Sequence, residues 1–121
     1  MPGLTIRRAK DECVFMGESL DQDDLAKTFD HKVRVQEIDE RERMVKLEVV
    51  SNVSDKESAS WEVHSLNEEG VLDLGDTEIR LTKTYMEHTK KNFVPKVELE
   101  FVAPNSIRIY RDNLIKKEKY E

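Results

Sequence analysis

The residues of this chain that are best suited to binding chemistry are three arginines near its two ends. Arg7 and Arg8 belong to the segment LTIRRA, and Arg111 belongs to the segment IRIYR. A guanidinium presents two parallel donors that fit a phosphate or the acceptor edge of guanine, which the point charge of an ammonium cannot match. Without further context, three solvated strand residues remain the simpler interpretation.

Other kinds of site chemistry are poorly represented. The histidines, His31, His64 and His88, are scattered at no metal-ligand spacing, and the chain contains no glycine-rich phosphate loop. The single cysteine, Cys13, stands in an apolar run, which favours a core residue over a nucleophile. We therefore expect no catalytic residue, no metal and no cofactor, and we expect that the protein is not an enzyme.

The arginines must be positioned by β-strands, because apolar and polar residues alternate through most of the chain. The alternation predicts three antiparallel hairpins, formed by residues 5–9 with 13–16, by 32–52, and by 79–81 with 97–101. An enlarged loop is expected at residues 85–96 of the last hairpin, and it contains Lys90 and Lys91.

Two segments have a helical pattern instead. Residues 20–29 place Leu25 and Phe29 four apart, with Asp21 and Asp24 in the arrangement of a capping box, so we expect a short inserted helix. Residues 112–120 combine helix formers with a lysine-rich end, which predicts a C-terminal helix.

Both terminal segments match a known pair of strand motifs. The first motif is L-x-L-T-R-R followed by G-E-x-x-x-I-G, and the second is A-P-x-x-[IV]-x-[IV]-x-R-x-E-[IL]. The matching positions are Leu4, Ile6, Arg8, Glu12, Met16 and Gly17 in the first, and Ala103, Pro104, Ile107, Ile109, Arg111, Asp112 and Leu114 in the second. The chain therefore resembles the carbon storage regulator family of bacterial translational repressors. Arg7, Ala9 and Asp11 depart from the family pattern, which has threonine, arginine and glycine there.

The chain is about twice as long as members of that family, so we searched it for a second copy. Residues 61–81 have the spacing of a second opening, with Leu74 and Gly75 at its I-G step. The expected organisation is a tandem fusion, with residues 1–52 as the first copy, 53–60 as the linker and 61–121 as the second copy.

The resemblance implies a fold as well. Family members are dimers with interleaved strands, so the fusion would be a pseudo-dimer in one chain and a monomer in solution. We expect residues 1–121 to form a single unit of mainly β structure, with interleaved antiparallel strands in a two-sheet barrel or sandwich. The inserted helix and the C-terminal helix complete this prediction.

Composition limits the class of partner. A net charge of −6 and a pI near 5.2 argue against a broad electrostatic grip on nucleic acid, although reading a few bases in an RNA loop needs only a local basic spot. No apolar run approaches the ~20 residues of a membrane span, and no signal peptide is visible. The single cysteine is typical of a reducing compartment, so we expect a cytoplasmic protein with no membrane partner.

The resemblance also implies one composite RNA site. In the family, the arginines equivalent to Arg8 and Arg111 come from the first strand of one subunit and the last strand of the other, where they hold a GGA sequence in an RNA loop. We expect both on an exposed strand surface. The expected RNA-binding residues are Ile6, Arg7, Arg8, Ala103, Pro104, Ile107, Ile109, Tyr110, Arg111 and Leu114. In the second copy Ser65, Leu66 and Asn67 replace T-R-R, so only one site per chain is expected.

The resulting functional expectation is a post-transcriptional regulator that binds GGA-containing loops of mRNA or small RNA. One alternative is a protein-interaction module that kept the fold, lost RNA binding, and acts on family members or on their protein antagonists. A plain structural domain is a third possibility.

Overall fold

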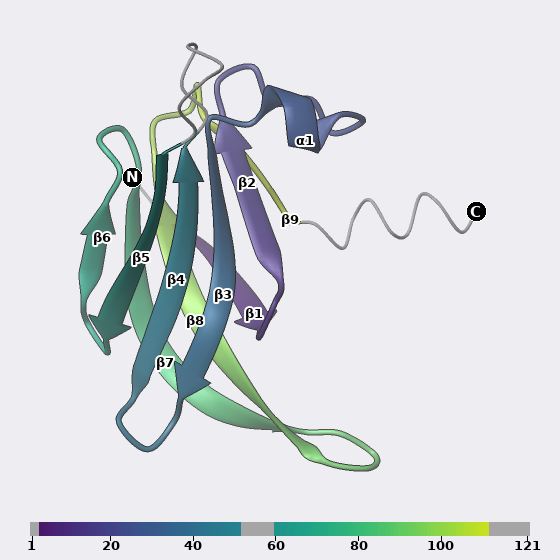
Figure 1. The fold of residues 1–121 in the computed structure, drawn as a ribbon, viewed down its shortest axis with the longest axis vertical. Helices are drawn as coiled ribbons and strands as arrows, with labels where there is room; N and C mark the ends of the chain where they lie inside the picture. Colours follow the sequence, from purple (N-terminus) through teal and green to yellow (C-terminus); the bar gives the residue numbers. More distant parts are fainter. Residues whose placement is uncertain (1–2, 52–59, 112–121) are drawn as a thin grey trace.

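Two antiparallel β-sheets face each other in the computed structural model, which describes residues 3–51 and 60–111 (Figure 1). The strands are β1 (Leu4–Ala9), β2 (Cys13–Gly17), β3 (His31–Asp39), β4 (Met44–Ser51), β5 (Ser60–Asn67), β6 (Val71–Asp73), β7 (Glu78–His88), β8 (Phe93–Val102) and β9 (Arg108–Arg111). One sheet has the order β1-β8-β7-β6 and the other β5-β4-β3-β2-β9. The prediction of a mainly β fold of antiparallel strands in two sheets is confirmed.

Alternating apolar residues of both sheets form the core. In β3, Val33 and Val35 are buried while their neighbours in sequence are not, and Leu99 and Phe101 of β8 face them from the other sheet. Burying an aliphatic side chain of this size contributes about 1.5–3 kcal/mol. The alternation in the sequence therefore reports which side of each strand points inward.

The two halves of the chain exchange their terminal strands. β1 pairs with β8 in the sheet that otherwise holds β6 and β7, while β9 pairs with β2 in the sheet that otherwise holds β3, β4 and β5. The predicted hairpin of residues 5–9 with 13–16 is therefore wrong, because its two strands lie in different sheets. Local alternation identifies strands, but here β8, far away in sequence, is the partner of β1, and β2 lies between β3 and the equally distant β9.

The crossings between the sheets have the same backbone arrangement in both halves. Asp11, between β1 and β2, and Glu69, between β5 and β6, have φ angles of 71° and 70°. Their amides donate to the carbonyl oxygens of Val35 at 2.7 Å and Leu81 at 2.8 Å. The amide of Val35 donates back to the carbonyl oxygen of Glu12, and the amide of Leu81 donates to that of Gly70, both at 3.0 Å. The pairing register also shifts directly after Val35 in β3 and after Leu81 in β7.

The inserted segment between β2 and β3 packs on the outer face of the larger sheet at β2 and β9. Its helix is a single turn, α1 (Leu25–Thr28), shorter than the expected helix at residues 20–29. Asp24 makes no side-chain capping bond, and so short a helix depends on packing for its stability. That packing comes from Leu20 and Leu25, which are buried with Phe15 in a second apolar cluster. Of the other expected segments, the C-terminal helix at 112–120 and linker residues 53–59 lie outside the described residues, while Ser60 begins β5.

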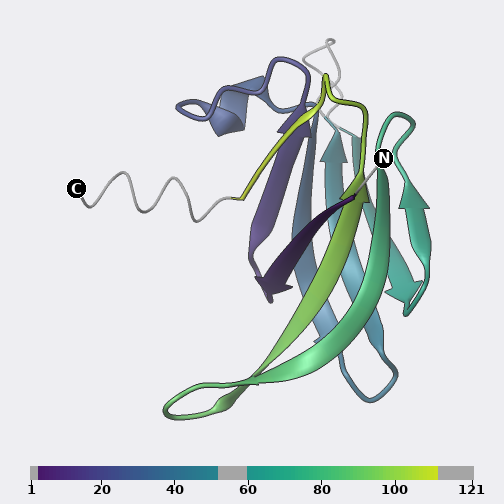
Figure 2. The same cartoon turned by 180° about the vertical axis from the view of Figure 1, so that it is seen from behind.

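The expected enlarged loop at residues 85–96 is wrong. β7 and β8 remain paired out to His88 opposite Phe93, so the turn comprises only residues 89–92. The paired strands project beyond the rest of the sandwich as a two-stranded ribbon (Figure 2). The inward-facing row of β8 continues here as Pro95 and Phe93, opposite Met86 and His88, but Met86 and Phe93 are exposed. Cross-strand pairs such as Lys96 with Glu87, at 2.6 Å, also stabilise this part.

Candidate functional site

A cleft lies where the edge strand of one sheet, β1, meets the edge strand of the other, β9. Both strands lie at the same lateral edge of the sandwich (Figures 1 and 2). We call this feature the edge cleft. It consists of two hollows that share lining residues, and its members are Leu4, Thr5, Ile6, Phe101, Ala103, Pro104, Asn105, Ile107, Ile109, Tyr110 and Arg111. It thus combines residues from both ends of the chain.

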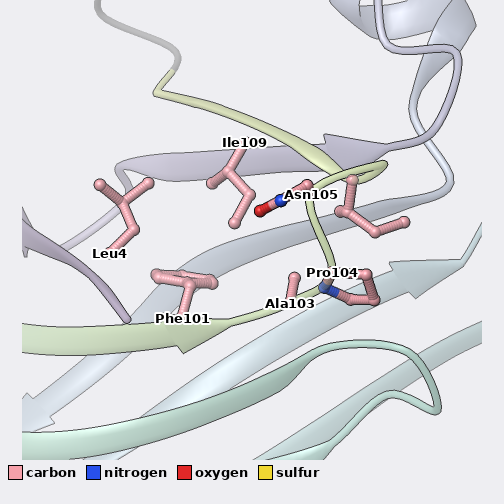
Figure 3. A pocket seen from close by; sticks show the side chains of 7 residues that line it. Leu4, Phe101, Ala103, Pro104, Asn105 and Ile109 are labelled. Carbon is pink, nitrogen blue, oxygen red and sulfur yellow. The ribbon is translucent and has the colours of Figure 1, made fainter. Parts of the chain in front are cut away.

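The edge cleft is small, and most of the residues that line it are apolar types. Its hollows measure about 230 Å³ and 320 Å³, at or below the lower limit of ~300–1,000 Å³ for small-molecule pockets. Figure 3 shows Leu4, Phe101 and Ile109 around the smaller hollow. Leu4 is 47% exposed although it occupies the same row of β1 as buried Ile6. Such dimensions suit one or two flat groups better than a large cofactor.

The turn between β8 and β9 supplies polar groups to the edge cleft. The amide of Ile107 donates to the carbonyl oxygen of Pro104 at 3.0 Å, which closes the turn around Asn105 and Ser106. Asn105 lies at the smaller hollow (Figure 3), and its side-chain amide offers both donors and an acceptor.

Four lining residues were not among the predicted site residues: Leu4, Thr5, Phe101 and Asn105. Asn105 occupies an unspecified position of the terminal motif, so its only signal was a polar residue directly after Ala-Pro. Leu4 and Thr5 directly precede Ile6 and Arg7. Because alternate residues of a strand share a face, the two-residue spacing of Leu4 and Ile6 could have placed Leu4 on the inner row.

Arg111 lies at the larger hollow and is exposed. In the pairing of β9 with β2, Ile109 is opposite Met16 and Arg111 is opposite Val14, and both partners face the main core. Arg111 therefore extends the inward-facing row of β9, beyond the point where the core ends. This position suits a cation at the mouth of an apolar cleft.

Tyr110 has a different environment on the opposite face of β9. Although it contributes to the larger hollow, its side chain packs against the second apolar cluster, which contains Cys13, Phe15, Leu20 and Leu25. Its side chain therefore links β9 to the inserted segment.

Arg8 is buried, contrary to the expectation of an exposed arginine. Only 3% of the residue is accessible, because Arg8 shares the inward-facing row of β1 with Ile6. Its Nε donates to the carbonyl oxygen of Arg7 at 2.8 Å and lies 3.9 Å from Oε1 of Glu12. The same carboxylate oxygen accepts a hydrogen bond from the amide of Ala9 at 2.6 Å. Arg8 does not line the edge cleft.

Arg7 is on the outer face of β1 and also does not line the edge cleft. Its side chain is 64% exposed, and its Nε lies 3.3 Å from Oε1 of Glu98. The guanidinium is 6.0 Å from the ring centre of Tyr85. A hydrogen bond from Thr82, together with Arg7, holds the pKa of Glu98 below its usual value.

The structure thus gathers seven of the predicted site residues in the edge cleft: Ile6, Ala103, Pro104, Ile107, Ile109, Tyr110 and Arg111. It separates Arg7 and Arg8 from that group, and Leu114 lies outside the described residues. Across residues 3–51 and 60–111, no cluster of His, Cys, Asp and Glu side chains could hold a metal ion. Within the same ranges, no helix has the length and apolar character to cross a membrane.

Comparisons with protein-family models, with curated proteins and with solved structures gave no match. The residues, the topology and the cleft geometry of this chain therefore carry the functional interpretation.

Proposed function

We propose that this protein is a non-catalytic RNA-binding regulator, built as a tandem fusion of two units that resemble the carbon storage regulator family. Strand exchange supports the fusion, because β1 of the first half joins β6, β7 and β8 of the second, while β5 and β9 of the second half join β2, β3 and β4 of the first. The matching turns at Asp11 and Glu69 support it further, since both halves repeat one backbone arrangement.

The edge cleft is the proposed RNA site. The observation that carries the proposal is that β1 and β9, the two motif-bearing strands, line one cleft from opposite ends of the chain. Unstacked bases of an RNA loop would contact Leu4, Ile6 and Ile109. Arg111 and Asn105 at the rim would donate to phosphates or base edges, which is how proteins commonly recognise single-stranded loops.

One such site per chain is proposed. β5 pairs with β4 as β1 pairs with β8: His64 stands opposite Leu47, as Ile6 stands opposite Leu99. The positions equivalent to Leu4, Ile6 and Arg8 are thus Glu62, His64 and Leu66. Nε2 of His64 donates to Oε2 of Glu62 at 2.9 Å, so a polar pair replaces the apolar row of the edge cleft.

A protein-interaction role is the second candidate, and the environment of Arg8 favours it. An arginine buried beside Glu12 is not available to a ligand, and a net charge of −6 opposes binding to a polyanion. In this version the apolar edge cleft would accept a peptide side chain of another regulator or its antagonist.

Titration calorimetry with a GGA hairpin and a scrambled-loop control distinguishes the RNA-binding role from the protein-interaction role. The proposal expects preference for GGA, a stoichiometry of one RNA per chain, and a loss of about 1–3 kcal/mol of binding free energy in Arg111→Ala. The matched control is His64→Ala at the position equivalent to Ile6, which should bind like the parent. Equal binding of both hairpins, or none, would favour the protein-interaction role.

A further inference from the structure

The ribbon formed by the distal parts of β7 and β8 is the most isolated element among the described residues. β1 pairs with β8 only over residues 96–101, and β6 pairs with β7 only over residues 78–80. Residues 86–88 and 93–95 therefore have a strand partner on one side only. Two-stranded ribbons are marginally stable alone, so this extension is a feature that the sandwich does not need.

Hydrogen bonds between Thr89 and Asn92 nevertheless close the tip of the ribbon. Within the turn, the amide of Thr89 donates to the carbonyl oxygen of Asn92 at 2.8 Å, and its hydroxyl donates to the same oxygen at 2.7 Å. The amide of Asn92 donates back to the Thr89 hydroxyl at 3.1 Å. These bonds hold Lys90 and Lys91 at the apex, where both side chains are exposed.

An exposed aromatic pair stands directly below the two lysines. The rings of His88 and Phe93 lie 4.8 Å apart between centres and are tilted by 32°. Phe93 is 65% exposed, the largest exposure among the big apolar side chains that the structure describes. Flat rings next to cations are the combination that single-stranded nucleic acid binds, through base stacking and phosphate pairing.

Charge distinguishes this tip from its counterpart in the other half. The segment HTKKNF, residues 88–93, has two lysines and no acidic residue, in a chain with a net charge of −6. The turn between β3 and β4 has the sequence DERER, residues 39–43, in which acidic residues outnumber arginines. An anionic ligand is therefore favoured at only one of the two hairpin tips.

A third aromatic side chain, Tyr85, lies on the outward-facing row of the ribbon, because its partner Lys96 alternates with buried Val97, and so it is on the opposite face from His88 and Phe93. Tyr85, at the base of the ribbon, has Lys83 Nζ 5.5 Å and the Arg7 guanidinium 6.0 Å from its ring centre. Leu99 is opposite Ile6 of the edge cleft, and six residues at ~3.4 Å each place Phe93 roughly 20 Å farther along β8. One RNA could contact both places.

We infer that the ribbon tip is a second contact for the RNA that occupies the edge cleft. A base of the single-stranded RNA that flanks the loop stacks on Phe93 and His88, and Lys90 and Lys91 pair with adjacent phosphates. The inference rests on the proposed RNA-binding function, and it names the part of the RNA that lies outside the GGA loop.

The test compares a minimal GGA hairpin with the same hairpin carrying a single-stranded tail at either end, by fluorescence anisotropy at several salt concentrations. The parent should bind one tailed RNA more tightly than the minimal one. Phe93→Ala should weaken binding to that tailed RNA about tenfold, since stacking on an aromatic ring is worth ~1–3 kcal/mol per base. The double variant Lys90→Ala with Lys91→Ala should reduce the salt slope by about 1.4, the value for two phosphate contacts to a single strand.

Control measurements separate this inference from the proposed function. All ribbon variants should bind the minimal hairpin like the parent, and Arg41→Ala at the tip of the β3–β4 hairpin should change neither RNA. If the ribbon variants bind the tailed RNA with the affinity and salt slope of the parent, the proposed ribbon contact is wrong, while the proposed RNA site in the edge cleft still stands. If binding of the tailed RNA depends on the ribbon residues but is changed neither by scrambling GGA nor by Arg111→Ala, only the proposed RNA site in the edge cleft is wrong. Failure of the parent to bind either RNA, or equal competition by polyglutamate, would overturn the ribbon contact.

Discussion

Arg7 and Arg8 are consecutive residues of β1, and the Nε of Arg8 donates to the carbonyl oxygen of Arg7 at 2.8 Å while their side chains occupy opposite faces. The side chain of Arg7 is 64% exposed and that of Arg8 is 4% exposed. One face of β1 therefore holds an arginine that meets solvent, and the other holds an arginine that belongs to the interior.

The buried arginine should stabilise the fold. We predict that Arg8→Ala lowers the free energy of unfolding by about 1–3 kcal/mol, because it removes a buried hydrogen bond and the packing of the side-chain stem. Urea denaturation followed by circular dichroism measures the loss. Arg111→Ala is the control, and it should stay within about 0.5 kcal/mol of the parent because its side chain is exposed. An Arg8→Ala variant as stable as the parent would contradict this role.

Gly17 ends β2 and Gly75 follows β6, and substitution should destabilise the fold at each for a different reason. A Cβ at Gly17 would lie 2.9 Å from the backbone nitrogen of Asp30, whereas a Cβ at Gly75 would have nothing within 4 Å. Gly75 instead has a φ of 94°, which side chains rarely adopt. We predict that both alanine variants lose about 1–2 kcal/mol of stability, through crowding at Gly17 and strain at Gly75.

Asparagine distinguishes these two causes. Gly75→Asn should recover part of the stability that Gly75→Ala loses, because asparagine adopts positive φ more readily. Gly17→Asn should be no better than Gly17→Ala, since the larger side chain meets the same backbone nitrogen. The same thermal or urea unfolding measurements apply, and recovery at Gly17 would show that crowding is not the cause there.

Glu98 should make stability depend on pH. Its pKa is lowered in the folded protein, first by the hydrogen bond from Thr82 at 2.9 Å and then by Arg7. Its stabilising contribution is therefore fully present above the ordinary value of 4.5 and is lost as the pH falls through the lower folded-state pKa. We predict that Glu98→Gln is less stable than the parent at neutral pH and that the difference shrinks in acid. A difference independent of pH would contradict it, and Glu78→Gln, at an exposed position of β7, is the control.

The chain should be a monomer. Its sheets already contain the strands that each half takes from the other, so no strand from a second molecule is required. Sedimentation equilibrium should give a mass near 14.2 kDa at every concentration tested. A mass that doubles with concentration would show that another edge of the sandwich takes part in association.

The sequence predicted most strands because their apolar residues alternate, as Val33 and Val35 do in β3. It did not predict that β1 pairs with β8, since alternation carries no information about a partner 90 residues away in sequence. The ribbon was missed because Pro95 and the polar residues 87–92 interrupt the alternation that marks a strand. The burial of Arg8 was in principle visible, because Arg8 is two residues from Ile6 and two-residue spacing puts both on one face.

The exchange of terminal strands also constrains how the protein is made. Arg7 of β1 meets Glu98 of β8 across 91 residues, so β1 has no strand partner until β8 has left the ribosome. Contacts of such long sequence range slow folding, and the apolar row of β1 remains exposed during translation. Synthesis speed and chaperone supply should therefore influence the yield of active protein more than they would for a sandwich built from consecutive hairpins.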